Sequence, residues 1–249
     1  MRILALESSS LSASVCVTDN GKLLAQTFQN CGMTHSATLL PMVEHMLKTA
    51  QLSLDEIDAV AVTVGPGSFT GIRIGVSTAK GIADAKNLPC IPVSSLAGAA
   101  RNVCPLPDNY IICPVMDARR GQLYNALFEC RYGELHRLTP DRLILSDALK
   151  QELISLSASN ITDNLHKKNI LLVGDGSQMC YNNFISTEEL SIQLASPGLQ
   201  YPCAYGTAAE AEYLAAKGQM IPSAQLVPSY LRQPQAVRER LAREAAAQS

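Results

Sequence analysis

The chain has 249 residues, of which 47% are hydrophobic and 17% charged, a composition typical of a globular protein with a sizeable core. Its 20 basic and 22 acidic residues give a formal charge of −2, so the chain lacks the basic excess that tight binding of nucleic acid normally requires. No apolar stretch approaches the roughly 18 residues of a membrane span, and we expect no signal peptide. The eight cysteines include no C-x-x-C spacing, which favours reduced thiols and a cytoplasmic location.

Hydrophobic periodicity in the first half predicts the element order β-β-β-α-β-α-β. Asp19-Asn20-Gly21 marks a hairpin turn, because asparagine and glycine tolerate the positive φ angles of primed turns. Pro41 falls early in the first helical pattern, where it would lie near the first turn or kink the helix. The expected elements cover residues 3–8, 12–18, 22–28, 39–50, 59–64, 71–85 and 90–93.

The second half begins after a proline-marked boundary, Cys104-Pro105-Leu106-Pro107-Asp108, and repeats the order β-β-β-α-β. Its elements are expected at 110–116, 122–130, 135–138, 146–156 and 170–173. Two such units in tandem predict a duplicated actin-like α/β fold, shared by Hsp70-type ATPases and sugar kinases, with domains at residues 1–104 and 105–249. The second domain would end in a tail, 238–244, whose arginines could touch RNA, although a solvated helix is the simpler expectation.

The segment Gly65-Pro66-Gly67-Ser68-Phe69-Thr70-Gly71 follows a buried strand and opens a helix, where backbone N–H groups can bind an anion. It departs from the dinucleotide-binding fingerprint and lacks the lysine of a P-loop, so its spacing favours a tight, helix-capping turn. Polar turns at 7–10, 117–121 and 174–176 lie where actin-like ATPases hold nucleotide, and paired arginines can clamp a carboxylate or phosphate. The simpler alternatives are a polar strand end, a solvated hairpin tip and a plain turn, respectively. The candidate nucleotide or anion site, expected to be vestigial, comprises Glu7, Ser8, Ser9, Gly65, Gly67, Ser68, Asp117, Arg119 and Arg120.

Small residues recur every four positions in the expected helix 71–85, one row running from Gly71 to Ala83 and another from Ser77 to Ala85. Glycine inside a helix costs about 1 kcal/mol relative to alanine, so these rows indicate a packing reason. Packing against the chain's own first helix is the simpler explanation, and a subunit interface built from both helices is the alternative. The candidate interface residues are Leu39, Leu40, Val43, Met46, Leu47, Arg73, Gly75, Ala79 and Lys80.

The four histidines form no metal-ligand pattern. His35 and His45 would lie roughly 80° apart around a helix, and His136 and His166 have no ligand partner at a suitable spacing. No Ser/His/Asp motif such as G-x-S-x-G is present. We therefore expect no catalytic residue in this chain, and no metal or cofactor bound by it.

Several motifs that together span nearly the whole chain are similar to those of one known family. They are Leu4-Ala5-Leu6-Glu7-Ser8-Ser9, His35-Ser36 with Leu39-Leu40-Pro41, the segment 65–75, Met116-Asp117-Ala118-Arg119-Arg120-Gly121 and Pro228-Ser229-Tyr230-Leu231-Arg232. On these motifs the chain resembles the TsaB (YeaZ) family, the small bacterial subunit of the machinery that makes threonylcarbamoyladenosine in tRNA. Glu7 departs from the commonest family pattern, in which many members have aspartate.

The resemblance implies a non-catalytic scaffold. The catalytic relative TsaD carries a His-x-x-x-His metal pair, and Ser95 and Ala99 stand at those places here. Neither residue is a plausible metal ligand. The resemblance implies pairing with TsaD through the two N-terminal helices, binding of a TsaE-like ATPase to the pair, and contact with tRNA through the complex. ATP and metal are then expected in the partner subunits.

Other functions stay open on the same fold. An ATP-dependent small-molecule kinase would need a general base and a complete phosphate cradle, for which Glu7 and Asp117 are the only candidates. A metallopeptidase is disfavoured because ligands are missing. Whether the isolated chain forms a homodimer through the helix pair is also open.

Overall fold

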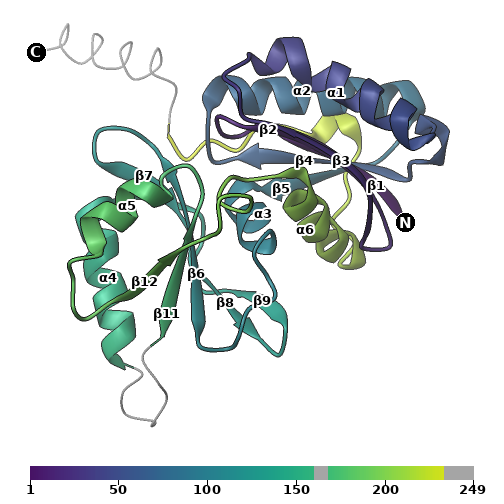
Figure 1. Cartoon of the computed structure of the whole chain (residues 1–249). Helices are drawn as coiled ribbons and strands as arrows, with labels where there is room; N and C mark the ends of the chain where they lie inside the picture. Colours follow the sequence, from purple (N-terminus) through teal and green to yellow (C-terminus); the bar gives the residue numbers. More distant parts are fainter. Residues whose placement is uncertain (160–167, 233–249) are drawn as a thin grey trace, which may run out of the picture.

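The computed structural model describes residues 1–159 and 168–232 of the chain. They form two α/β units, each built on one sheet (Figure 1). Two short 3₁₀ turns, Leu54–Glu56 and Ser223–Gln225, complete the helical elements of these residues. All eight cysteines are free thiols. No helix in the described ranges is long and apolar enough to cross a membrane.

The first sheet has the strand order β3-β2-β1-β4-β5. Its strands are β1 (Arg2–Glu7), β2 (Ala13–Asp19), β3 (Lys22–Gln29), β4 (Ala59–Gly65) and β5 (Cys90–Ser94). The pairs β1–β2 and β2–β3 are antiparallel, whereas β4 runs parallel to both β1 and β5. Because β1 and β4 are buried along nearly their whole length, both faces of the sheet must be covered by helices.

Helices cover both faces of the first sheet (Figure 1). On one face α1 (His35–Ala50) and α2 (Phe69–Lys86) lie side by side and bury an apolar cluster that includes Leu39 and Val76. On the other face α6 (Ala204–Ala216) packs its alanines against β1 and β2.

The second sheet follows the path β10-β7-β6-β11-β12, with β8 paired to β6 and β9 paired to β8. Its strands are β6 (Tyr110–Asp117), β7 (Gln122–Asn125), β8 (Phe128–Arg131), β9 (Glu134–Arg137), β10 (Arg142–Leu145), β11 (Asn169–Val173) and β12 (Ser191–Leu194). One face packs against α3 (Ser95–Arg101), and the other against α4 (Ser146–Ser159) and α5 (Ser177–Phe184). The duplicated actin-like architecture expected from the order of elements is confirmed.

The strand expected over 122–130 is interrupted opposite Pro114. Both β7 and β8 pair with β6 in one continuous antiparallel register, with a gap between them. Pro114 has no N–H to donate to the ladder, and the buried side chain of Asn125 donates to the Pro114 carbonyl at 3.0 Å. The expected single strand is therefore divided into two.

Helix boundaries also differ from the sequence expectation. The helix α1 begins at His35, so Pro41 lies in its interior rather than in its first turn. The helix α2 begins at Phe69 and is capped by Ser68, whose Oγ accepts the Gly71 N–H at 3.2 Å. Five short or weakly periodic elements were not expected from sequence: α3, β10, α5, β12 and α6. The tail 238–244 lies outside the described residues.

The end of the described chain returns to the first sheet. After α6, residue Ile221 exchanges backbone hydrogen bonds with Cys90, and Leu226 is buried among residues of the first core. Ser229 N then donates to Val64 O at 2.7 Å. The expected domain boundary after residue 104 stays a prediction, and residues 204–232 pack against elements on its N-terminal side.

Candidate functional site

A cavity of about 560 Å³ lies at the carboxyl ends of β1, β6 and β11 and at the first turn of α2. It is lined by Ser9, Ser10, Leu11, Gly67, Ser68, Phe69, Thr70, Met116, Asp117, Ala118, Arg119, Tyr124 and Asp175. Five residues of the candidate anion site therefore meet here, from turns far apart in sequence. Glu7, Ser8, Gly65 and Arg120 do not line the cavity.

Glu7 and Ser8 are buried behind the cavity and hydrogen-bonded within the protein. Glu7 Oε1 accepts from both the backbone N–H and the hydroxyl of Ser9 at 2.6 Å, and Thr207 Oγ1 donates to its other oxygen at 3.4 Å. Burial raises the pKa of the Glu7 carboxyl. The Ser8 hydroxyl donates to Gly71 O at 2.9 Å. These groups hold the turn after β1 and leave little for a ligand.

Glycines of the Gly65–Gly75 segment are required by this turn. A Cβ on Gly67 would lie 2.2 Å from Ser9 O, and one on Gly71 would lie 2.1 Å from Ser8 O. Gly75 likewise faces the Ser8 hydroxyl, at 2.3 Å. The buried glycine row of α2 thus packs against the turn after β1, rather than against α1 alone as the simpler expectation had it.

The turn after β6 is more open. Asp117 N donates to Asp175 Oδ1 at 3.1 Å, and Arg119 N donates to Asp117 Oδ1 at 2.6 Å. Arg119 and Arg120 have φ angles of 63° and 58°, in the left-handed region, and both side chains are exposed. Burial, together with the charge of Asp117, raises the pKa of Asp175 to about 6. Two carboxyl groups in the cavity would repel a bare phosphate, so its lining suits hydroxyl or cationic groups better.

The candidate interface residues divide into three groups. Four apolar residues of α1, namely Leu39, Val43, Met46 and Leu47, fill the chain's own core, as do Gly75 and Ala79 of α2. Leu40 is 46% exposed. Arg73 and Lys80 hold the C-terminal segment: Arg73 Nε donates to the Tyr230 hydroxyl at 2.9 Å, and Lys80 Nζ donates to Leu226 O at 3.3 Å.

The two positions at which the resemblance implies a lost histidine pair, Ser95 and Ala99, are buried. Both side chains belong to α3, and the Ser95 hydroxyl has no hydrogen-bond partner among the described residues. The helix packs closely on α6, since a Cβ on Gly206 would lie 2.2 Å from Gly98 O. Within residues 1–159 and 168–232, no group of three His, Cys, Asp or Glu could hold a metal ion.

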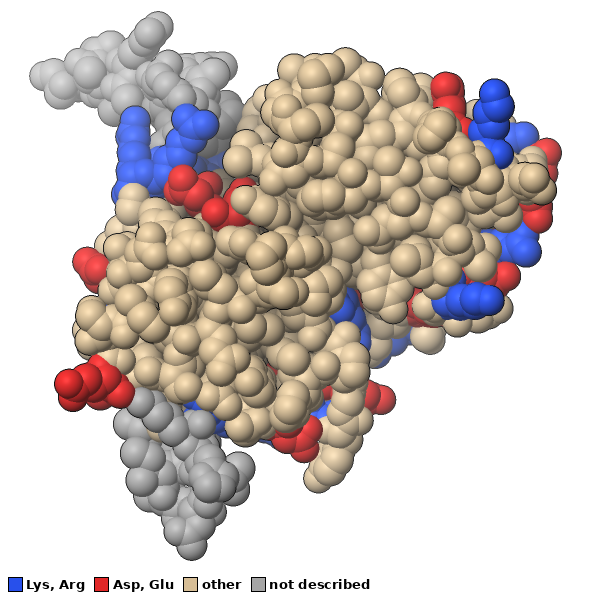
Figure 2. All heavy atoms as spheres, in the orientation of Figure 1, with Lys and Arg blue, Asp and Glu red and all other residues tan. Residues whose placement is uncertain are grey.

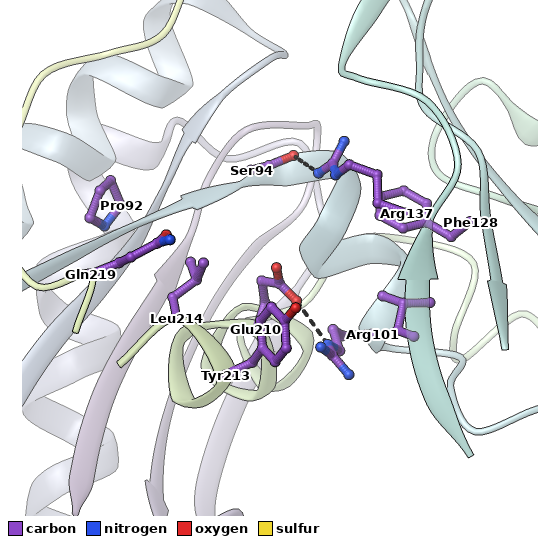
Figure 3. A pocket seen from close by; sticks show the side chains of 10 residues that line it. Pro92, Ser94, Arg101, Phe128, Arg137, Glu210, Tyr213, Leu214 and Gln219 are labelled. Atoms are coloured by element: carbon purple, nitrogen blue, oxygen red, sulfur yellow. Dashed lines mark hydrogen bonds and ion pairs between the residues drawn. The ribbon is translucent and has the colours of Figure 1, made fainter. Parts of the chain in front are cut away.

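A second cavity, of about 380 Å³, lies between β5, α6 and the β8–β9 hairpin (Figure 3). It is lined by Pro92, Ser94, Arg101, Phe128, Leu135, Arg137, Glu210, Tyr213, Leu214 and Gln219. Its two arginines are neutralised locally. Arg101 pairs with Glu210 at 2.8 Å, and Arg137 pairs with Asp141 at 2.5 Å. The sequence patterns did not predict this cavity, because its residues come from short elements far apart in the chain.

The sequence patterns also did not predict that residues of the C-terminal segment lie beside the first cavity. Tyr230 stacks on Phe69 with ring centroids 4.7 Å apart, and the Arg73 guanidinium lies 3.8 Å from the Phe69 ring centroid. Arg232 Nη1 donates to Ala118 O at 2.8 Å. The only sequence signal for this contact was the motif Pro228-Ser229-Tyr230-Leu231-Arg232.

Known proteins support one family. A family model described as TsaD, tRNA N6-adenosine threonylcarbamoyltransferase, matches residues 29–239. The tRNA threonylcarbamoyladenosine biosynthesis protein TsaB of Escherichia coli (strain K12) is 32% identical over 71% of this chain and 80% of that protein. The TsaB of Haemophilus influenzae is 29% identical over 93% and 94% of the two chains. The TsaB of Bacillus subtilis is 32% identical, over 60% of this chain and 65% of that protein.

Solved structures agree on the fold. YeaZ from Pseudomonas aeruginosa superposes with a TM-score of 0.71 at 23% identity, over 92% of this chain and 99% of that one. Component A of (R)-2-hydroxyglutaryl-CoA dehydratase from Acidaminococcus fermentans has a TM-score of 0.50 at 14% identity, over 87% and 99% of the two chains. Taken with the sequence matches, the chain belongs to the TsaB (YeaZ) family and takes part in the biosynthesis of threonylcarbamoyladenosine in tRNA.

Proposed function

We propose that this chain is a non-catalytic subunit that binds and activates a TsaD-like catalytic subunit. The packing of Ser95 and Ala99 supports the non-catalytic part, because small side chains buried between α3 and α6 offer neither ligands nor space for a metal. Catalysis then belongs to the partner, which would supply the metal.

The main support for binding of a TsaD-like subunit is the exposed row of small residues on α2. Ser77, Gly81 and Ala85 lie on the solvent side of the helix, and no atom of residues 1–159 or 168–232 beyond the adjoining turns of the helix lies within 4 Å of a Cβ built on Gly81. Internal packing therefore gives no reason for a glycine there, although it costs about 1 kcal/mol relative to alanine. A flat helix surface lets a partner helix approach closely. With the exposed Leu40 of neighbouring α1, this row forms the proposed docking face.

This placement replaces most of the interface residues expected from sequence, since those on α1 other than Leu40 are buried. In the same proposal a TsaE-like ATPase joins the pair, the complex holds tRNA, and ATP and metal reside in the partner subunits. The isolated chain would pair with a second copy through the same face, and the assembly would work in the cytoplasm.

Mixing the chain with a TsaD-like subunit tests the proposal. We expect a heterodimer in gel filtration at micromolar concentration, and threonylcarbamoyladenosine formation on tRNA that depends on this chain once the ATPase subunit is added. Separate elution of the two proteins, or equal modification without this chain, would refute it.

A further inference from the structure

Most arginines of the described residues are paired with carboxylates, and those that are not lie on α2, the turn after β6 and the C-terminal segment that contacts both. Ion pairs engage Arg2, Arg101, Arg131, Arg137 and Arg142. Within residues 1–159 and 168–232, no carboxylate pairs with Arg73, Arg119, Arg120 or Arg232. We call these four residues the arginine cluster.

The fold connects the members of the cluster through short contacts. Arg232 reaches the carbonyl of Ala118, the residue before Arg119, at 2.8 Å. Two residues earlier, Tyr230 accepts a hydrogen bond from Arg73. The cluster therefore joins the turn after β6 to α2 along one rim of the first cavity. In Figure 2, basic side chains stand out beside acidic ones at the upper left of the molecule.

An aromatic pair, the exposed Tyr230 and the half-buried Phe69, lies beside this rim. Tyr230 is 39% exposed and stacks on Phe69, whose other neighbour is the Arg73 guanidinium. Guanidinium groups bind phosphate oxygens in a bidentate manner, and an exposed aromatic ring offers a surface for a nucleic acid base. The combination is typical of surfaces that bind single-stranded nucleic acid.

The backbone conformation of the turn after β6 also indicates a binding role for its arginines. Two consecutive arginines take left-handed φ angles, which asparagine or glycine would adopt more easily. Their side chains are exposed, so packing does not explain the choice of arginine. Unfavourable backbone conformations of this kind are frequent at binding sites.

We infer that the arginine cluster binds the phosphates of an RNA strand, with Tyr230 as a stacking surface. The inference rests on the proposed function, in which the assembly acts on tRNA. Asp117 and Asp175 both line the cavity and disfavour a phosphate inside it, so the strand would run along the rim. With a net charge of −2, the chain would add a local contact to a grip supplied mainly by its partners.

The test compares two double variants in complex with the TsaD-like subunit. One is Arg119→Ala with Arg120→Ala; the control, Lys22→Ala with Arg131→Ala, removes the same charge at exposed sites away from the cluster. Binding of an unmodified fluorescent tRNA transcript is measured as a function of salt. The cluster variant should bind about tenfold more weakly, and its salt dependence (log K against log salt) should be shallower by roughly 1.5.

Further variants separate charge from geometry. Replacing both Arg119 and Arg120 with lysine should leave the salt dependence of tRNA binding unchanged. Tyr230→Leu should weaken tRNA binding and also leave its salt dependence unchanged. Equal affinity and equal salt dependence of the cluster and control variants would overturn the inference. The inference would also be overturned if the cluster variant bound tRNA as tightly as the control but no longer bound the ATPase subunit. That result would indicate that the arginine cluster binds an acidic protein partner. Gel filtration of the heterodimer reports separately on the proposed function.

Discussion

The turns after the first strand of each sheet occupy corresponding places in the repeated order of elements, yet they differ in almost every physical respect. In the turn after β1, Ser8, Ser9 and Ser10 are all buried, and glycines at and just before the start of α2 approach Ser8 and Ser9 at distances that exclude a side chain. In the turn after β6, Arg119 and Arg120 are exposed, and the backbone takes left-handed angles.

Under the proposed function, the difference indicates how a duplicated fold can serve as a scaffold. In the first turn, the polar groups are used for internal hydrogen bonds, which fix α2 against the sheet and present its outer face. In the second turn, charged side chains remain available at the surface. We therefore expect substitutions in the first turn to change stability, and those in the second to change binding or pH dependence.

The largest effect is expected for Gly71→Ala. The new Cβ would overlap Ser8 O, a backbone atom that cannot move without displacing β1 or α2, so unfolding should be easier by about 3 kcal/mol. Urea denaturation measures the loss. Gly81→Ala is the matched control, because no residue in the described part of the chain packs against its Cβ, and it should stabilise the chain by up to about 1 kcal/mol. Equal changes in stability for the two substitutions would contradict the difference between the tightly packed Gly71 and the exposed Gly81.

An intermediate effect is expected for Asp175→Asn. The pKa of Asp175 is raised to about 6 from an ordinary 3.8, so the folded state binds this proton more tightly than the unfolded state. The stability gained from protonation is complete below about pH 4 and is lost as the pH rises through about 6. The variant should therefore exceed the wild type in stability at pH 8 by about 1–2 kcal/mol.

Thermal unfolding of the Asp175→Asn variant and the wild type between pH 4 and pH 8 tests whether the wild type loses stability relative to the variant as the pH rises. The asparagine Oδ1 can still accept from Asp117 N, so the hydrogen bond is preserved. A wild type that gains stability over this interval relative to the variant would show that Asp175 is ionised favourably in the folded state.

The smallest effect is expected for Arg120→Asn. Asparagine tolerates the left-handed conformation better than arginine, so the chain should gain up to about 0.5 kcal/mol. Urea denaturation is again the measurement, and the same substitution should weaken tRNA binding by the complex. A loss of stability would mean that the Arg120 side chain has a structural role.

The repeated order of strands and helices could be predicted from sequence because it is written in local patterns. Apolar runs such as Ala59–Gly65 and the Asn20-Gly21 turn are signals that tertiary packing does not override. The interruption opposite Pro114 and the burial of Leu39 and Met46 depend on which face of an element meets another, and hydrophobic spacing does not reveal whether an apolar face is core or interface.

The candidate site was predicted in part. Ser9, Gly67, Asp117 and Arg119 do meet at one cavity, because turns after corresponding strands meet in a duplicated fold. The contribution of Tyr230 could not be predicted, since it depends on residues 221–232 crossing back over α2, and loop paths leave no periodic signal.

The central claim, that the outer face of α2 holds the catalytic partner, is tested most directly by Gly81→Leu. The added side chain enters open space, so the fold should keep its stability, while a close helix contact should be blocked. Ala216→Leu, at an exposed position of α6 on the opposite side of the sheet, is the control. Binding of the TsaD-like subunit is measured by titration. We predict that Gly81→Leu binds the TsaD-like subunit at least about tenfold more weakly than the wild type, and that the control binds it as tightly as the wild type does. Equal affinity of both variants and the wild type would contradict a docking face on α2.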